Sequence, residues 1–174
     1  MKSKTKTITL TAVCLAMLIV VQLATRTMPQ LVTGSLVNSI LIITVLTAGT
    51  AGGILTAIIS PFLAFLLGIG PKFLPFVPII SLGNFAIIII FAFIIKRLNL
   101  NNYLQWVLAI VLGAAVKFTV LFFGIVKGVL PILGLPENKS AVIAASFGAT
   151  QLITALIGGI IAFVIVSILK KRIR

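Results

Sequence analysis

A single lysine stands inside an apolar run that is long enough to cross a lipid bilayer. The run extends from Val107 to Val126, and Lys117 lies past its middle. A membrane-spanning helix needs about 20 mostly apolar residues, and a cation inside one costs at least about 2.5–3.5 kcal/mol. The chain has one acidic residue, Glu137, which falls in a predicted loop. Lys117 therefore has no obvious counter-ion within the membrane.

Two explanations for Lys117 are open at this level. In the first, its ammonium lines a pocket that receives an anionic or carbonyl-rich ligand, since ionisable residues inside membranes usually mark functional sites. In the second, the side chain extends along its helix and places the ammonium at the membrane surface. A ligand whose affinity is unchanged by Lys117→Ala would favour the second explanation.

Three amide side chains fall in the outer half of other predicted spans, two of them at a depth similar to that of Lys117. At the rise of an α-helix, Asn84 lies about 10 Å from the outer end of its helix, whereas Gln151 and Lys117 each lie about 15 Å deep. Asn38 is one turn below the outer end of its own helix. Apolar walls with a few convergent polar groups are typical of small-molecule pockets. We therefore predict a substrate site containing Lys117, Asn84, Gln151 and Asn38, with simple hydrogen bonding between helices as the alternative for the amides.

The elements that must position these residues follow from composition. Of the 174 residues, 61% are hydrophobic and 9% are charged, which is typical of an integral membrane protein. We predict an all-α fold: a compact bundle of six transmembrane helices forming one substrate-binding domain over residues 1–174. The expected helices are 7–25, 36–48, 54–69, 77–95, 103–126 and 141–169. Gly49, Gly52 and Gly53 predict a tight turn between the second and third helices, and Pro61 predicts a kink.

The net charge of +13 does not indicate a nucleic-acid partner, because the cations flank the apolar runs. Nine cations fall at the termini and between the fourth and fifth helices: Lys2, Lys4, Lys6, Lys96, Arg97, Lys170, Lys171, Arg172 and Arg174. Four fall at the opposite end: Arg26, Lys72, Lys127 and Lys139. Since positive loops stay in the cytoplasm, we expect both termini to be cytoplasmic.

Several chemistries are excluded by what the chain lacks. It has no histidine and one cysteine, Cys14, so we expect no metal site and no other cofactor. There is no nucleotide-binding loop of the GxxxxGK[ST] type, so the chain cannot hydrolyse ATP itself. It also has no pair of carboxylates and no nucleophile with a base. We therefore expect that it is not an enzyme.

Two short motifs and the overall organisation resemble those of a known family. The first helix carries Ala12 and Ala16, a small-x-x-x-small spacing that lets backbones approach closely, and residues 47–68 read TAGTAGGILTAIISPFLAFLLG. With six spans in under 200 residues and a basic N-terminus, the chain resembles the substrate-binding subunit, or S-component, of energy-coupling factor transporters. The resemblance implies capture of a vitamin or similar micronutrient from outside a bacterial cell membrane by outer loops and helices. It further implies docking through Ala12 and Ala16 on a coupling transmembrane subunit that works with two ATPase subunits.

Two rival functions stay open. One is a stand-alone secondary carrier, which is weakened by the lack of Asp, Glu or His within the spans and of any clear repeat of the two halves. The other is a membrane assembly or regulatory protein that transports nothing and contacts only membrane lipid and protein, in which Lys117 would merely reach the membrane surface.

The distribution of cations gives a direct test of orientation. A cysteine introduced near Asn138 should react with a membrane-impermeant reagent added outside the cell, whereas one at Lys170 should not. Labelling at the C-terminus from outside would overturn the topology.

Overall fold

The computed structural model describes residues 4–70 and 73–172, and this part of the chain is helical without strands. The elements are α1 (Lys4–Ala24), α2 (Gln30–Leu66), α3 (Phe76–Arg97), α4 (Asn102–Leu121), the π-helix η1 (Phe122–Val129), α5 (Leu130–Ile132), α6 (Glu137–Phe147) and α7 (Ala149–Arg172). Of the cations used above to predict orientation, Lys2, Lys72 and Arg174 lie outside the described residues.

Five helical stretches of the described chain are long and apolar enough to cross a membrane. They are Lys4–Ala24, Gln30–Leu66, Phe76–Arg97, Asn102–Ile132 and Glu137–Leu169. The prediction of an all-helical, multi-pass membrane fold is therefore confirmed. The predicted number of six helices is not confirmed, because α2 joins two of the predicted spans into one element.

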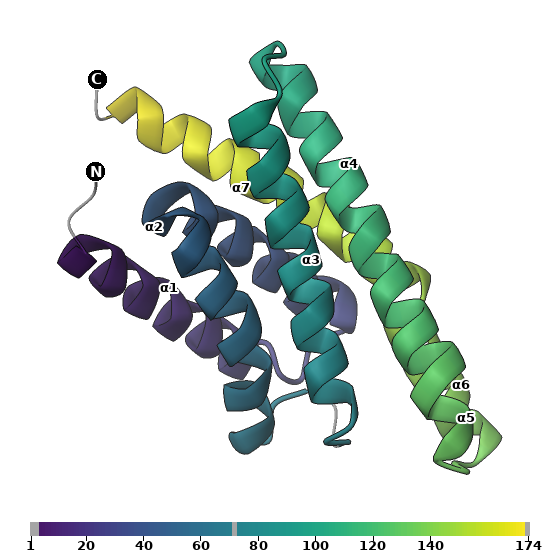
Figure 1. The fold of residues 1–174 in the computed structure, drawn as a ribbon. Helices are drawn as coiled ribbons and strands as arrows, with labels where there is room; N and C mark the ends of the chain where they lie inside the picture. The colour runs from purple at the N-terminus through teal and green to yellow at the C-terminus, as the bar shows by residue number, and fades with distance from the viewer. Residues whose placement is uncertain (1–3, 71–72, 173–174) are drawn as a thin grey trace.

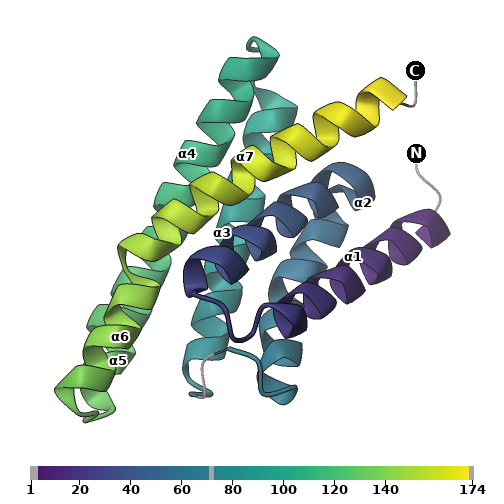
Figure 2. The same cartoon turned by 180° about the vertical axis from the view of Figure 1, so that it is seen from behind.

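The element α2 is nevertheless interrupted at one residue, Gly49. Its φ of 87° and ψ of 176° are not helical and separate two helical arms of α2, residues 30–48 and 50–66. Positive φ is costly for residues with a Cβ, so glycine is the residue that suits this position. At Gly49 the chain doubles back, and the two arms lie side by side (Figures 1 and 2). The tight turn was thus predicted correctly. Gly52 and Gly53 already belong to the second arm, where a Cβ would lie 2.6 Å from Cβ of Ala48 and 2.5 Å from Cγ2 of Val45 on the first arm, respectively.

Other helix boundaries differ from those predicted. The link between α1 and α2 is shorter than the predicted loop 26–35, because Gly34 is helical and packs against Thr154 of α7. The predicted loop 127–140 is mostly helical as well, with η1 and α5 continuing α4 and α6 beginning at Glu137. The predicted helix 141–169 is divided at Gly148, between α6 and α7. Glycine and proline were read as helix breakers at positions where tertiary packing keeps the helix.

Pro61 lies in the second arm of α2, where the backbone stays helical. A proline inside a helix cannot donate a backbone hydrogen bond and disturbs the carbonyls of the preceding turn. The carbonyl that Pro61 leaves without its usual donor is that of Ala57, four residues earlier. The next carbonyl, that of Ile58, accepts a hydrogen bond of 3.1 Å from the hydroxyl of Ser81 on α3, which ties α2 to α3.

The first arm of α2 lies inside the bundle and packs against α1 and α7, while the second packs against α3 (Figures 1 and 2). The beginning of α1 and the end of α7 lie at one end of the bundle. The α1–α2 and α2–α3 links lie at the opposite end (Figure 1). One apolar cluster, around Leu41, Ile87 and Phe91, fills the bundle, and a second surrounds Phe76 and Leu121. The candidate site described below lies where these two clusters meet.

α7 approaches the first arm of α2 closely at Gly158. A Cβ placed on Gly158 would lie 2.6 Å from both Cβ of Asn38 and the carbonyl oxygen of Ser35, and 2.9 Å from the nitrogen of Ser39. Two of these atoms belong to the backbone and cannot turn aside. Gly158 therefore sets the spacing between α2 and α7, and with it the position of Asn38.

We expect Gly158→Ala to lower the free energy of unfolding by about 1–3 kcal/mol, the range for overpacking a filled site. The direction of the change tests the close contact at Gly158, because in an isolated helix alanine is more favourable than glycine by about 1 kcal/mol. Destabilisation by alanine would therefore have to come from the contact with α2. The matched control is Gly83→Ala, whose Cβ meets only the flexible side chain of Leu121, at 3.0 Å or more. Equal stability of Gly158→Ala and the unmodified protein, measured by thermal unfolding in detergent, would contradict this role.

Candidate functional site

Three helices meet at the ammonium of Lys117 on α4. Its Nζ donates a hydrogen bond of 2.6 Å to Oδ1 of Asn38 on α2 and one of 2.8 Å to Oδ1 of Asn84 on α3. All three side chains are buried, and Lys117 is 3% exposed. The ammonium therefore stays inside the bundle and does not reach the membrane surface. Because an ammonium has three N–H donors, it retains capacity for one further acceptor beyond the two amides.

The hydrogen bonds continue from Asn38 onto α7. Nδ2 of Asn38 donates to Oγ1 of Thr154 over 3.4 Å, and that hydroxyl donates to the carbonyl oxygen of Gln151 over 3.1 Å. The side-chain Nε2 of Gln151 donates in turn to the carbonyl oxygen of Ser146, at the end of α6, over 3.0 Å. Gln151 is also buried, with 4% of its surface exposed. Polar groups of four long helices thus form one connected set.

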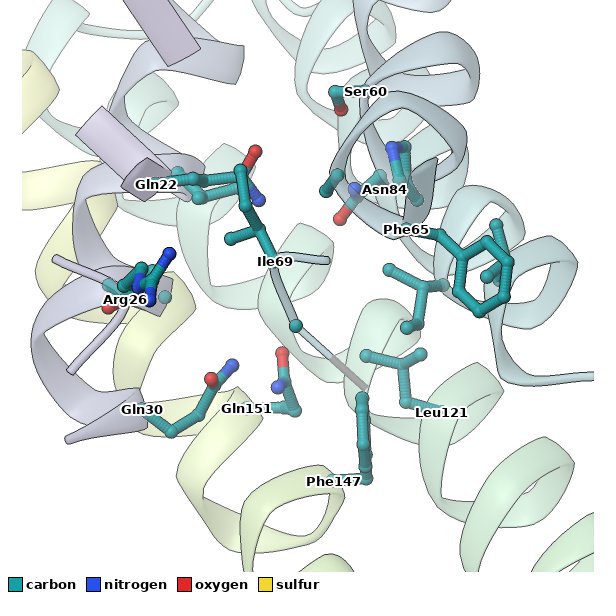
Figure 3. A pocket seen from close by; sticks show the side chains of 18 of the residues that line it. Gln22, Arg26, Gln30, Ser60, Phe65, Ile69, Asn84, Leu121, Phe147 and Gln151 are labelled. Carbon is teal, nitrogen blue, oxygen red and sulfur yellow. The ribbon is translucent and has the colours of Figure 1, made fainter. Parts of the chain in front are cut away.

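A cavity of about 150 Å³ lies beside this set, and its lining includes Arg26 and Met28 of the α1–α2 link and Ile69 and Gly70 of the α2–α3 link. In Figure 3, the side chains of Gln22, Arg26 and Gln30 lie along one side of the cavity, with Gln151 next to Gln30 and Asn84 on the other side. Apolar side chains complete the lining; they include Phe65, Ile69, Leu121 and Phe147. A cavity of about 150 Å³ can hold a molecule the size of benzene, so a compact ring fits its enclosed part.

The structure brings the predicted substrate residues together. Lys117, Asn84 and Gln151 line the cavity, and Asn38 lies behind it as a partner of Lys117. The two alanines predicted to dock a partner lie elsewhere. Ala12 and Ala16 are on the exposed face of α1, whereas its buried face consists of Thr11, Cys14 and Leu18.

The lining residues that sequence reasoning missed include Gln22, Arg26 and Gln30. Arg26 was counted only as a cation that indicates orientation. These residues surround the α1–α2 link, which is anchored by Thr25, a buried residue. Its hydroxyl donates to the carbonyl of Val21 over 2.8 Å, and its carbonyl accepts from the hydroxyl of Thr33 over 3.0 Å. The only signal in the sequence was that the family resemblance places ligand contacts in outer loops.

The cavity is electropositive. Two cations line it, Lys117 and Arg26, and no carboxylate does among the described residues. The single acidic residue, Glu137, is exposed in the first turn of α6. Neutral amide oxygens hold the ammonium in place without cancelling its charge, so an anion or a carbonyl oxygen is the chemical group that this cavity favours. The described residues contain no cluster of side chains that could bind a metal ion.

The comparison with known families agrees with this arrangement. A sequence model of the family described as "ECF transporter, substrate-specific component" matches residues 6–170, nearly the whole chain. The chain belongs to this family. No curated protein and no solved structure gave a match.

Family membership gives the cavity its general meaning. Substrate-specific components of ECF transporters are transport subunits of membranes and not enzymes, and they work with an ECF module on a small-molecule substrate. In a chain with this role, an enclosed cavity lined by buried polar groups is the natural candidate for the substrate site.

The contact between Lys117 and Asn38 can be measured by a double-mutant cycle. Asn38→Leu leaves the buried ammonium without one of its acceptors, and we expect it to lower the free energy of unfolding by about 1–3 kcal/mol. In a Lys117→Met background the same change should cost at least about 1 kcal/mol less, since coupling energies of contacting residues are about 0.5–3 kcal/mol.

Asn138→Leu, at an exposed position of α6, is the control and should show no coupling to Lys117→Met. Additive effects of Asn38→Leu and Lys117→Met on unfolding in detergent would show that the two side chains do not depend on each other.

Proposed function

We propose that this protein is the high-affinity binding subunit of an ATP-driven importer, which captures a vitamin or related micronutrient from outside the cell and delivers it through an energy-coupling factor module. The observation that carries the proposal is the cavity around Lys117, Asn84 and Gln151 in a chain of this family. Asn38 supports the site from behind, through its hydrogen bond to Lys117. The preferred ligand is anionic or rich in carbonyl groups, because two cations face a cavity without carboxylates.

The proposed topology places the cavity on the outer side of a bacterial cell membrane. Each arm of α2 crosses the membrane once, which makes six crossings and puts both termini in the cytoplasm. The two arms, residues 30–48 and 50–66, have 19 and 17 residues. These lengths correspond to about 28 Å and 25 Å of helix, close to the hydrocarbon thickness of about 30 Å.

The proposed partners are one coupling transmembrane subunit and two ATPase subunits, which supply the energy that this chain cannot. The exposed face of α1 supports docking at Ala12 and Ala16, because neither residue is needed for packing within the described chain. In contrast, the small residues Gly158 and Gly159 of α7 already pack against α2 and against Ile110.

The proposal is tested by identifying the small molecule that the protein retains through purification. Full-length protein purified in mild detergent should release a single small molecule on denaturation, identifiable by mass spectrometry. Uptake of that molecule into vesicles should require both the coupling subunit and ATP hydrolysis. Uptake by this chain alone would indicate a secondary carrier, and retention of nothing together with no uptake would indicate a protein without a transport role.

Lys117→Ala should weaken binding of the retained molecule at least tenfold, measured by equilibrium dialysis. The reason is the loss of a charge-assisted hydrogen bond, which contributes about 1.5–3 kcal/mol, and 1.4 kcal/mol corresponds to a factor of ten. Lys117→Arg should also impair binding, since the planar guanidinium does not fit a site shaped for an ammonium. Unchanged affinity in both variants would remove Lys117 from the site.

Ala12→Trp and Ala16→Trp should each abolish transport while ligand affinity stays within twofold of the unmodified protein. A large side chain on this face blocks close approach of a partner helix, and the ligand cavity is lined from other faces. Ala115→Trp, at an exposed alanine of α4, is the matched control and should transport normally. If the complex with the coupling subunit purifies intact with both alanines replaced, docking occurs elsewhere.

A further inference from the structure

The amide of Gln151 is held in one orientation. Its Nε2 donates to the carbonyl oxygen of Ser146 over 3.0 Å, so this end of the amide is already used. Oε1 makes no hydrogen bond within the described part of the chain, and Figure 3 shows it pointing into the cavity. The side chain is buried, with 4% of its surface exposed. The oxygen is thus available to a donor on the ligand, and a ligand that covered it without supplying a donor would leave a buried polar group unpaired, which is costly.

A second amide beside the cavity also lacks a partner. Oε1 of Gln22, in the last turn of α1, is buried and has no hydrogen bond among the described residues. No hydrogen bond fixes this amide, and the terminal torsion of glutamine has a broad, roughly two-fold profile. Gln22 can therefore turn either its oxygen or its nitrogen toward a ligand.

Arg26 lies four residues after Gln22, in the α1–α2 link beyond the end of α1, and it also lines the cavity. It is exposed, and no described carboxylate lines the cavity beside it. Arginine presents a planar set of N–H donors that matches a carboxylate or phosphate. An anionic group at the rim would thus meet Arg26 while the rest of the ligand lies deeper, between the amides and the apolar side formed by Phe65, Leu121 and Phe147.

We propose that Arg26 and Gln151 determine which substrate this subunit takes: a small anion that also carries an amide, ureido or ring N–H. The anionic group pairs with Arg26, and the N–H donates to Oε1 of Gln151. This inference rests on the proposed function and adds to it a requirement for a hydrogen-bond donor. Cationic molecules are rejected by two cations, and anions without an N–H leave Oε1 of Gln151 unpaired.

The test is a binding screen on the full-length protein in detergent with the water-soluble vitamins, sorted by charge and by donor. Biotin and pantothenate represent anions with an N–H, nicotinate an anion without an amide or ring N–H donor at neutral pH, riboflavin a neutral imide and thiamine a cation. The largest thermal stabilisation should come from the first class. A best binder from any other class overturns the inference and leaves the proposed function standing, whereas no stabilisation by any vitamin counts against the proposed function itself.

The best binder is then compared with its methyl ester, which lacks the anionic charge. Esterification should weaken binding to the unmodified protein at least tenfold and binding to Arg26→Gln by less than twofold. Arg97→Gln, at the far end of α3, is the matched control and should respond to esterification as the unmodified protein does. An equal loss in Arg26→Gln and the unmodified protein would place the anionic group elsewhere.

Gln151→Met should weaken the best binder by three- to tenfold, and methylation of the ligand N–H should weaken binding to the unmodified protein but not to Gln151→Met. A purely structural glutamine would not remove the effect of methylation. Gln105→Met is the control, because Gln105 donates to the carbonyls of Ile94, Ile95 and Leu98, around the end of α3. Gln105→Met should lower thermal stability and leave the affinities for the ligand and for its N-methylated form as they are in the unmodified protein. Equal sensitivity to methylation in Gln151→Met and the unmodified protein would overturn the role of Gln151.

Discussion

The structure depends on how one buried ammonium, that of Lys117, is held in a chain with a single acidic residue. Lys117 binds the oxygens of Asn38 and Asn84, and because an ammonium only donates, both amides must present their oxygens to it. This leaves Nδ2 of Asn38 to face the other way, where it meets Thr154 of α7. A single cation thus fixes the orientation of side chains on α2, α3 and α7. An ion pair in its place would neutralise the site, whereas the amides leave a positive cavity.

The membrane fold was largely predictable, because its signals are strong and local. Apolar runs of sufficient length indicate membrane helices, and Gly49 marks the turn at which α2 reverses. The predicted helix boundaries were wrong where tertiary packing overrides the local preferences of the residues. Gly34 continues a helix because the close approach of Thr154 needs a residue without a side chain, and the segment from Lys127 to Ile132 stays helical by continuing α4 through η1.

The candidate site was predictable only for residues that are unusual where they stand. Lys117, Asn84 and Gln151 are conspicuous because polar groups are rare inside apolar runs, and their similar depths suggested that they meet. Gln22 and Arg26 gave no such signal, since polar residues are ordinary at the end of a membrane helix. Their place at the cavity follows from the anchoring of the link by Thr25. Which atoms of each amide are already used, and which stay available, depends on partners such as Ser146 that no spacing rule identifies.

The uneven burial of α1 has a consequence for how this subunit associates with other proteins. Its outward face carries Ile8, Val13, Met17 and Val20, all largely exposed. In a bilayer these side chains already contact acyl chains of similar polarity, so exchanging lipid for a protein helix gains little hydrophobic free energy. The strength of any contact on this face then comes from the fit of one helix surface to another and from the ordering of the displaced lipid. Such an association is readily reversible, and its lifetime varies with the thickness and acyl-chain composition of the membrane.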